Sequence, residues 1–268
     1  MLDYLRKEIG LLHDSGQFST SRNYLRTLNS FSSFLENCDI PLTALDSDTA
    51  CKYEKWLWGR RVSKNSSSFY MRILRAAYNK AVQEQLVEQA FPFHEVYTGI
   101  AKTSKRAVSE KTILKLQRLD LSYSSALALS RDLFVFSYST RGMAFVDMAY
   151  LKKSDLKNGI IIYRRRKTGQ QLTIKWEKCM EDIIAKNDGC STTQYLLPII
   201  TNPCADERTQ YRNAISRINV ALKEVARLAG LNMPLTMHCA RHCWASIAKS
   251  KNIPLSVISE GMGHDSEE

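Results

Sequence analysis

The sequence predicts a mainly α-helical protein with a small antiparallel β-sheet, divided into two domains. Its 268 residues exceed the ~100–200 residues of a typical single domain. In residues 1–95 the apolar side chains recur at helical spacing, for example between Tyr24 and Leu35. The β-branched run 159–163 is followed, after a Thr-Gly turn, by the alternating run 171–176, and this pattern predicts a hairpin.

Signals for helix starts and ends recur through residues 1–95. Asp46 precedes one apolar-periodic run as a cap, and Gly59 ends that run. The polar stretch 64–68 predicts a turn, and the periodic stretch 69–88 predicts a third strong helix. We expect these helices to form a small bundle.

A basic linker separates the two predicted domains. Pro92, Gly99 and the sequence Lys-Thr-Ser-Lys-Arg at 102–106 mark a change in composition. We therefore assign three segments: a helical first domain at 1–95, a linker at 96–104 and a second domain at 105–268.

The second domain is expected to be helical on both sides of the hairpin. Ser109 begins a helix, and the apolar segment 127–138 predicts a buried helix. The hairpin has a basic tip, because every residue from Arg164 to Lys167 is cationic.

The sequence carries a strong excess of positive charge. Lys plus Arg is 38 and Asp plus Glu is 27, which gives a formal net charge of +11. This excess favours a polyanionic partner, either a nucleic acid or an anionic membrane surface. No run of ~18 apolar residues is present and no signal peptide opens the sequence, which weakens the membrane interpretation. We therefore expect a cytoplasmic protein that binds nucleic acid and has no membrane partner.

The cysteines argue against both disulfides and a metal site. They are odd in number and scattered, which indicates reduced thiols. Cys239, His242 and Cys243 could share a helix face, but a structural zinc site needs four ligands and no second pair lies nearby. We expect no metal and no other cofactor.

The strongest chemical signal is the segment Leu-Thr-Met-His-Cys-Ala-Arg-His at 235–242. His238 and Arg241 are three residues apart and share one face of a helix. Arg241 can donate two hydrogen bonds to a phosphate, and His238 can donate to a phosphate oxygen or move a proton near neutral pH. His264, after Gly263, would approach the same phosphate from a second direction. For the His-x-x-Arg spacing by itself, the plain alternative is a structural histidine and a surface arginine.

These segments resemble the His-x-x-Arg-His box and the Leu-Gly-His segment of the tyrosine recombinase (phage integrase) family. The sequence Arg-Gly-Met-Ala-Phe-Val-Asp-Met at 141–148 resembles the integrases of Bacteroides-type mobile elements. The resemblance implies a two-domain DNA clamp, with a SAM-like core-binding domain at 1–95 and a catalytic domain at 105–268. It also implies bacterial, site-specific recombination or integration by a homo-tetramer on double-stranded DNA. The chemistry implied is transesterification through a 3′-phosphotyrosine intermediate.

The family's general acid is a lysine on a β-hairpin, and Lys167 occupies the matching place in this sequence. The lysine protonates the leaving 5′ oxygen. Repulsion from the three preceding arginines would lower the pKa of Lys167 and favour proton release. The plain alternative is that the whole basic run only binds phosphates.

The first arginine of the family pattern, Thr-Gly-Leu-Arg, is missing here. Matching Gly142 and Met143 to Gly-Leu puts Ala144 where that arginine belongs, with Asp147 as the acidic residue that follows. Arg141 precedes Ala144 by three residues, so on a helix it would lie one turn away on the same side. We expect Arg141 to substitute for the missing arginine.

The family's nucleophile is a tyrosine roughly two to three helical turns after the Gly-His segment. Here Glu268 ends the sequence four residues past His264, and the last tyrosine, Tyr211, precedes the His-x-x-Arg box. The resemblance therefore implies a catalytic domain that is incomplete at its C-terminal end, truncated before the tyrosine. We expect this chain alone to be inactive in cleavage.

The remaining basic residues are candidates for contacts with the DNA backbone. In the third predicted helix, cations alternate with Tyr70 and Tyr78, a pattern that suits a phosphate backbone but also an ordinary solvated helix face. The DNA-binding candidates are Arg72, Arg75, Lys80, Lys105, Arg106, Arg164, Arg165 and Arg166.

Two rival functions use the same scaffold. A non-catalytic DNA-binding protein is favoured by Ala144 and by the absent tyrosine, but it has little use for the residues Lys167, His238, Arg241 and His264 together. A type IB topoisomerase-like strand transferase shares the chemistry. Relaxation of supercoiled DNA by a monomer would distinguish it from site-specific strand exchange.

We predict that binding to duplex DNA weakens steeply as salt rises, because each neutralised phosphate releases counterions. Fluorescence anisotropy with a labelled duplex over a salt series should give a linear fall of log affinity with log salt concentration. A flat dependence would contradict binding driven by phosphates.

Overall fold

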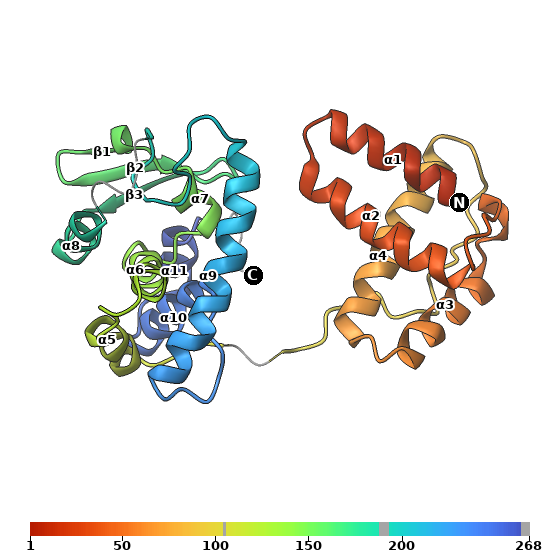
Figure 1. Ribbon diagram of the computed structural model, residues 1–268. Coiled ribbons are helices and arrows are strands. Elements are labelled where there is room, and N and C mark those ends of the chain that lie inside the picture. The colour runs from red at the N-terminus through yellow and green to blue at the C-terminus, as the bar shows by residue number, and fades with distance from the viewer. Residues whose placement is uncertain (104–105, 188–192, 264–268) are drawn as a thin grey trace. The chain divides into compact units, whose positions relative to one another are not determined.

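The computed structural model describes residues 1–103, 106–187 and 193–263 (Figure 1). The chain divides into two compact units, an N-terminal unit (Met1–Thr103) and a C-terminal unit (Ser104–Glu268). Both are mainly helical, and the C-terminal unit also contains a small antiparallel sheet, as the sequence predicts. No described helix is both long and apolar enough to cross a membrane.

The N-terminal unit is built from four α-helices among its described residues, with one short 3₁₀ turn at Leu42–Ala44. The helices are α1 (Leu2–Asp14), α2 (Phe18–Phe34), α3 (Ser47–Gly59) and α4 (Lys64–Gln83). Rings of α2 and α3 form its centre, where Phe31 and Phe34 lie 4.9 and 5.1 Å from Tyr53 between ring centroids. The buried Tyr53 hydroxyl donates to Ser30 Oγ at 2.7 Å, so this large side chain leaves no polar group unpaired.

Helix α4 begins earlier than the sequence pattern indicates, so the turn predicted at 64–68 is wrong. Ser63 caps the helix by accepting from the Ser66 amide at 3.3 Å, and this local bond lets the polar stretch continue as helix. Ser67 and Ser68 are buried, and the Ser68 hydroxyl donates to Gly99 O at 2.5 Å. The helix also ends at Gln83 rather than at residue 88, because Gln85 has a left-handed φ of +59°.

The C-terminal unit surrounds one apolar helix. Its helices are α5 (Glu110–Arg118), α6 (Ser125–Ser139), α7 (Phe145–Ala149), α8 (Lys178–Lys186), α9 (Glu207–Leu228), α10 (Met237–Ser250) and α11 (Leu255–Gly261). Helix α6 contains the predicted segment 127–138 and packs against α5, α8, α9 and α10 (Figure 1). Ser109 caps α5 as predicted, by accepting from the Thr112 amide at 3.3 Å.

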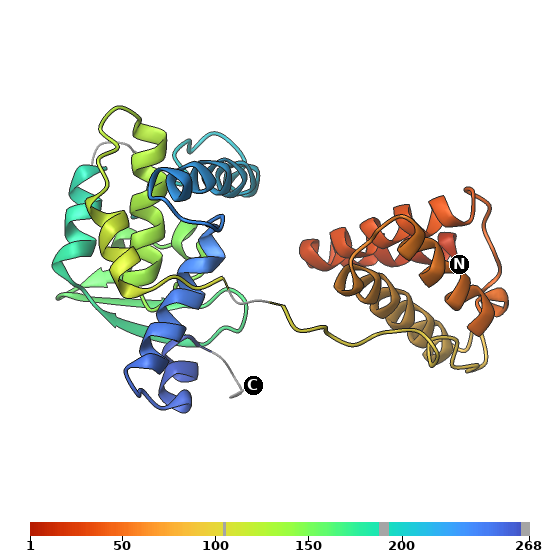
Figure 2. The ribbon, with the colours of Figure 1, turned by 90° about the horizontal axis from the view of Figure 1, so that it is seen from below.

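Three antiparallel strands form the sheet, in the order β1 (Leu156–Lys157), β2 (Ile160–Arg164) and β3 (Gln171–Lys175). The predicted hairpin is β2 with β3. The short strand β1 was not predicted, because two residues carry no readable pattern. In β2 and β3 burial alternates, with Ile161 paired to Ile174 and Tyr163 paired to Leu172 on the core side. The hairpin runs past α10, and its tip reaches the residues that follow α11 (Figure 2).

We predict that Lys80→Met destabilises the N-terminal unit by about 1–3 kcal/mol. The Lys80 ammonium lies 2.6 Å from Glu8, whose side chain is 2% exposed, so the substitution leaves a buried carboxylate without its cation. Urea unfolding gives the free energy. Lys52→Met is the control, because it removes an ion pair to Asp48 that is exposed on both sides and should leave stability unchanged. Equal losses in both variants would contradict this account.

Candidate active site

Helix α10 carries the His-x-x-Arg-His box. Its buried side chains Cys239, Ala240 and Cys243 pack into the core, which fixes the rotation of the helix. Cys243 Sγ also accepts from the Val108 amide at 3.2 Å, so its thiol is engaged in packing. With the core face fixed, His238 and Arg241 fall on the side that meets the hairpin and α11.

Arg241 is buried, at 7% exposure, and is held by two carbonyls. Its Nη1 donates to Gly142 O at 2.8 Å, and its Nη2 donates to Met262 O at 2.5 Å. Burial lowers the pKa of Arg241 to about 10, and the neighbouring cation Arg165 contributes in the same direction. The guanidinium is therefore fixed between the α6–α7 turn and the end of α11, and it remains charged at neutral pH.

Gly142 makes this close approach possible. It has a left-handed φ of +73°, and a Cβ placed on it would lie 2.7 Å from the Cα of Arg241. No side chain fits there without moving α10, because the contact is with backbone. Gly142 is thus required for the backbone of Arg241 to pack this closely.

Arg165 is the second buried arginine of the site. Its side chain is on the core face of the hairpin, in step with Ile161 and Tyr163, and its Nη1 donates to Gly263 O. From the sequence, Arg165 was predicted to be a DNA-binding residue. In the structure its guanidinium is buried against Gly263. The alternation of inward and outward side chains along β2 continues one residue past the end of the strand, so Arg165 points inward.

The other basic residues of the hairpin tip are exposed. Arg166 lies over the ring of Tyr150 at 3.9 Å from the centroid, and Arg164 donates to Gly169 O at 3.2 Å. Lys167 is also exposed at this tip. A cavity of about 320 Å³ opens beside them between α7 and β2, and Arg164, Arg166, Tyr150 and Asp147 are among the residues that line it.

Asp147 is a buried carboxylate among these cations. Its Oδ1 accepts from the backbone amide of Arg166 at 2.9 Å, which ties α7 to the hairpin tip. Burial raises the pKa of Asp147, while the Arg166 amide and the guanidiniums of Arg165 and Arg241 oppose that rise. The carboxylate therefore anchors the loop that carries Lys167.

Arg141, the expected substitute for the missing arginine, lies at the edge of this cluster. It is exposed and has a left-handed φ of +58°, which is unusual for a residue with a side chain. Its Cδ lies 3.7 Å from the position of a Cβ built on Gly261, so its side chain runs along the end of α11. Ala144 caps α7 and contributes no polar group.

The two histidines of the box contact each other. The rings of His238 and His242 are 4.5 Å apart and meet edge to face. Burial lowers the pKa of His238 below 6.5, and repulsion from His242 and Arg241 adds to this effect. His238 is thus poised as a neutral ring near pH 7, and an approaching phosphate would favour its protonated form.

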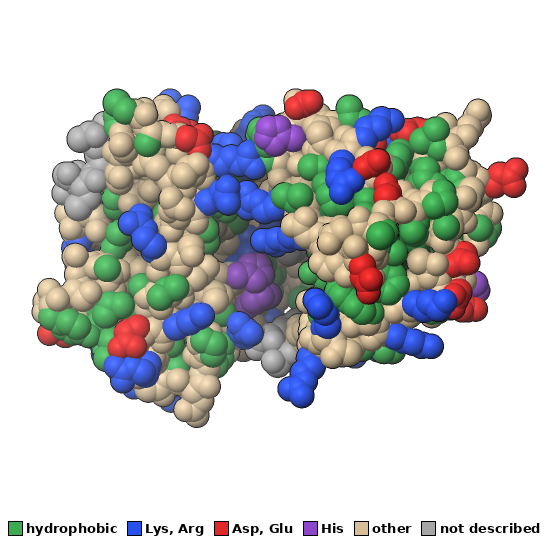
Figure 3. Space-filling model, turned by 45° about the vertical axis from the view of Figure 1, so that its right-hand side comes forward, with side chains coloured by type: hydrophobic (Ala, Val, Ile, Leu, Met, Phe, Trp, Pro, Cys, Tyr) green, Lys and Arg blue, Asp and Glu red, His purple; other side chains and the backbone are tan. Residues whose placement is uncertain are grey.

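The structure brings Arg141, Arg241 and His238 together with the hairpin that bears Lys167. Lys and Arg side chains gather beside histidines on the face of the C-terminal unit shown in Figure 3. His264 and Lys105 lie outside the described residues. Arg106 is exposed near the start of the C-terminal unit.

In the N-terminal unit, the three predicted DNA-binding cations lie on α4 in different surroundings. Lys80 is paired with Glu8 and Glu84. Arg75 is exposed and donates to Thr98 Oγ1 at 3.1 Å, and the Nε of Arg72 is buried without a hydrogen-bond partner among the described residues. Sequence reasoning missed the pairing of Lys80, which depends on a residue in another helix.

Comparisons with known proteins support the fold described above. The sequence model for the phage integrase SAM-like domain matches residues 1–98. A lambda integrase (75-356) dimer bound to a COC′ core site superposes with a TM-score of 0.72 and 16% identity, over 99% of this chain and 95% of that chain. The chain has the fold of the tyrosine recombinases.

Two further recombinases share this tyrosine-recombinase fold. The Tn1549 transposon integrase in complex with a circular intermediate DNA gives a TM-score of 0.71 and 16% identity, over 99% of this chain and 92% of that chain. The XerH site-specific recombinase bound to its difH substrate gives a TM-score of 0.68 and 16% identity, over 100% of this chain and 80% of that chain. No curated protein sequence matches the chain.

We predict that Gly142→Ala is more damaging than Gly159→Ala. Both glycines have nearly the same left-handed φ, +73° and +72°, so backbone strain is matched. Only at Gly142 does the added methyl meet backbone, and this overpacking should cost about 1–3 kcal/mol more. Urea unfolding measures the difference, and equal losses would show that Arg241 does not depend on this contact.

Proposed function

We propose that this chain is a bacterial tyrosine recombinase of mobile-element type, which cuts and rejoins double-stranded DNA at specific sites in the cytoplasm. The observation that carries the proposal is the convergence of Arg241, His238, Arg141 and the Lys167 hairpin in one basic cluster of the C-terminal unit. The SAM-like domain and the recombinase fold support it.

The residues of the cluster suit stabilisation of a phosphate that gains negative charge. Arg241 is already held in place by Gly142 and Met262, so no reorganisation is needed when DNA arrives. Neutral His238 can take up or share a proton at a phosphate oxygen. Lys167 would protonate the leaving 5′ oxygen from the hairpin tip, which Asp147 anchors through the amide of Arg166.

We further propose that the attacking tyrosine is not among the described residues. Tyr163 lies near Arg241 and Arg165, but burial raises its pKa, which opposes the formation of a nucleophilic phenolate. Tyr195 donates to Glu207 at 2.7 Å, and Tyr211 stacks on Phe145 at 5.8 Å. The reaction would then proceed through a 3′-phosphotyrosine formed by a tyrosine outside the described chain, within a tetramer on DNA like the lambda integrase tetramer bound to a Holliday junction.

The proposal is tested with a nicked suicide duplex chosen by selection from random sequences. The chain by itself should bind this duplex but leave no covalent band on a denaturing gel. A version extended through a tyrosine beyond His264 should form the band, and Arg241→Ala in that version should abolish it. A covalent band from the unextended chain would refute the assignment of the nucleophile, and no band from the extended chain would refute the proposed chemistry.

We predict that Arg141→Ala slows cleavage by the extended chain ~10²–10³-fold, because the transition state loses one preorganised donor. Rates come from single-turnover gels. Adding Ala144→Arg to this variant should restore cleavage, since both positions would serve one pocket. Near-normal cleavage by Arg141→Ala would exclude the substitute role.

A further inference from the structure

The ring of Tyr150 lies against the tip of the β2–β3 hairpin. The Arg166 guanidinium is stacked over this ring, with its central carbon 3.9 Å from the ring centroid. Tyr150 directly follows α7, so the stack joins two elements that are separate in the sequence. Arg166 directly precedes Lys167 in the chain. A side chain that holds Arg166 therefore acts on the residue next to Lys167.

The Tyr150 ring is itself held by two other tyrosines. It meets Tyr195 edge to face at 5.8 Å between ring centroids, and it lies 6.3 Å from the ring of Tyr211 on α9. The backbone beside it is fixed as well, because the Leu196 amide donates to Leu151 O at 2.7 Å. The ring cannot turn away without disturbing these contacts, so it offers Arg166 a fixed surface.

The stack gives the hairpin tip a second point of attachment to the segment around α7. The first point is the Arg166 amide, which donates to Asp147 at 2.9 Å. One hydrogen bond leaves the tip free to rotate about it, whereas a bond and a stack together fix the direction in which the chain continues to Lys167. The cavity of about 320 Å³ that Tyr150 and Arg166 line would give the tip room to move if the stack were lost.

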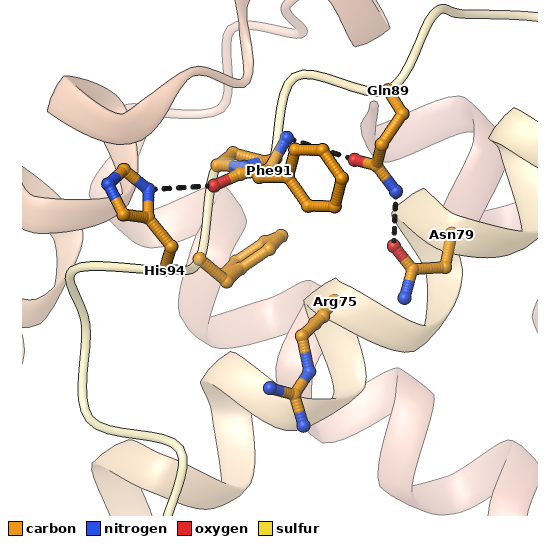
Figure 4. A pocket seen from close by; sticks show the side chains of 7 residues that line it. Arg75, Asn79, Gln89, Phe91 and His94 are labelled. Carbon is orange, nitrogen blue, oxygen red and sulfur yellow. Dashed lines mark hydrogen bonds between the residues drawn. The ribbon is translucent and has the colours of Figure 1, made fainter.

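An arginine near an aromatic ring does not by itself make such a contact. In the N-terminal unit, Arg75 and Phe91 line the same cavity of about 200 Å³, but Figure 4 shows the Arg75 guanidinium directed away from the Phe91 ring. Arg75 donates instead to Thr98 Oγ1 at 3.1 Å. The stack of Arg166 on Tyr150 is therefore a specific pairing and not a result of crowding among basic and aromatic side chains.

We propose that Tyr150 is a positioning residue for Lys167, which acts by holding Arg166 and so directs the hairpin tip toward the scissile phosphate. This inference rests on the proposed function, in which Lys167 protonates the leaving 5′ oxygen. In that step the attacking tyrosine oxygen bonds to phosphorus, the P–O5′ bond breaks, and the departing oxygen takes a proton from the Lys167 ammonium. A proton donor acts only within hydrogen-bond reach of its acceptor, so a displaced tip slows this proton transfer.

The test measures single-turnover cleavage by the extended chain on two duplexes. One has the natural phosphodiester, and in the other sulfur replaces the bridging 5′ oxygen. A thiolate leaves without being protonated, because a thiol is far more acidic than an alcohol, so the sulfur duplex needs no general acid. We expect Tyr150→Leu to cleave the phosphodiester about 10–10²-fold more slowly than wild type but the sulfur duplex at the wild-type rate. Tyr150→Phe keeps the ring and should cleave both duplexes normally.

Three variants serve as controls. Lys167→Ala should show the same pattern as Tyr150→Leu with a larger loss, and Arg241→Ala should be slow on both duplexes, because its guanidinium stabilises the phosphate and not the leaving group. Tyr138, like Tyr150, is a partly buried tyrosine packed against the core of the C-terminal unit, but it lies on α6. Tyr138→Leu should therefore leave both rates unchanged.

A second measurement uses the chain without the extension and needs no cleavage of DNA. Trypsin cuts after the cations of the tip when the tip opens, and mass spectrometry identifies the site. We expect Tyr150→Leu to be cut there about tenfold faster than wild type, while Tyr150→Phe and Tyr138→Leu are cut at the wild-type rate.

Arg166→Met removes the stack from the other side. Arg166 is exposed, so this change leaves the core intact. The variant should be slow on the phosphodiester and normal on the sulfur duplex, as Tyr150→Leu is, and combining the two changes should add no further loss.

The outcomes separate this inference from the proposed function. If Tyr150→Leu cleaves the phosphodiester as wild type does, is equally slow on both duplexes, or is cut by trypsin no faster, the inference is wrong and the proposed function stands. If Lys167→Ala is equally slow on both duplexes, Lys167 is not the general acid, and the inference fails with that assignment. If the extended wild type cleaves neither duplex, the proposed function itself fails.

Discussion

The candidate site depends on the way in which Arg241 is buried. A guanidinium out of water must find acceptors, and here they are the backbone carbonyls of Gly142 and Met262. These carbonyls belong to segments 99 and 21 residues away in sequence, so the bonds join the α6–α7 turn, α10 and the end of α11. Arg165 is held in the same way, because its guanidinium donates to the carbonyl of Gly263. The three segments can then move only together, which keeps the cations preorganised.

The same burial leaves the cluster short of negative charge. Arg165 and Arg241 are both 7% exposed and repel each other, and Asp147 is the buried carboxylate that acts on both. Carbonyl dipoles supply the rest, but they are partial charges. An anion that enters the site therefore meets an incompletely neutralised field, in which a full negative charge is stabilised more than in water. Burial is the main cause of the lowered pKa of Arg241 and of His238, and repulsion from neighbouring cations adds to both.

Sequence patterns predicted the elements that local rules determine. The hairpin followed from β-branched alternation, and the starts of α3 and α5 followed from Asp46 and Ser109 as caps. The start of α4 was missed because a run of serines reads as a turn, although Ser63 caps it as a helix. The burial of Arg165 was not foreseen, because a basic run suggests a surface, whereas strand parity from Ile161 and Tyr163 turns it inward. The hydrogen bonds from Arg241 to two backbone carbonyls could not be predicted from the sequence. Every residue has a backbone carbonyl, so no residue type marks which distant carbonyl will accept.

The position of Arg141 follows from the same constraint. Gly142 must pass within contact of the Arg241 backbone, which forces a tight turn after α6, and both residues of that turn have a positive φ. A side chain leaving the chain at Arg141 in this conformation is directed toward Gly261 and not along α6 as a regular helix would direct it. This side chain therefore does not follow the path expected on a helix, yet the strained turn brings it to the end of α11, where the carbonyl-bound arginines converge.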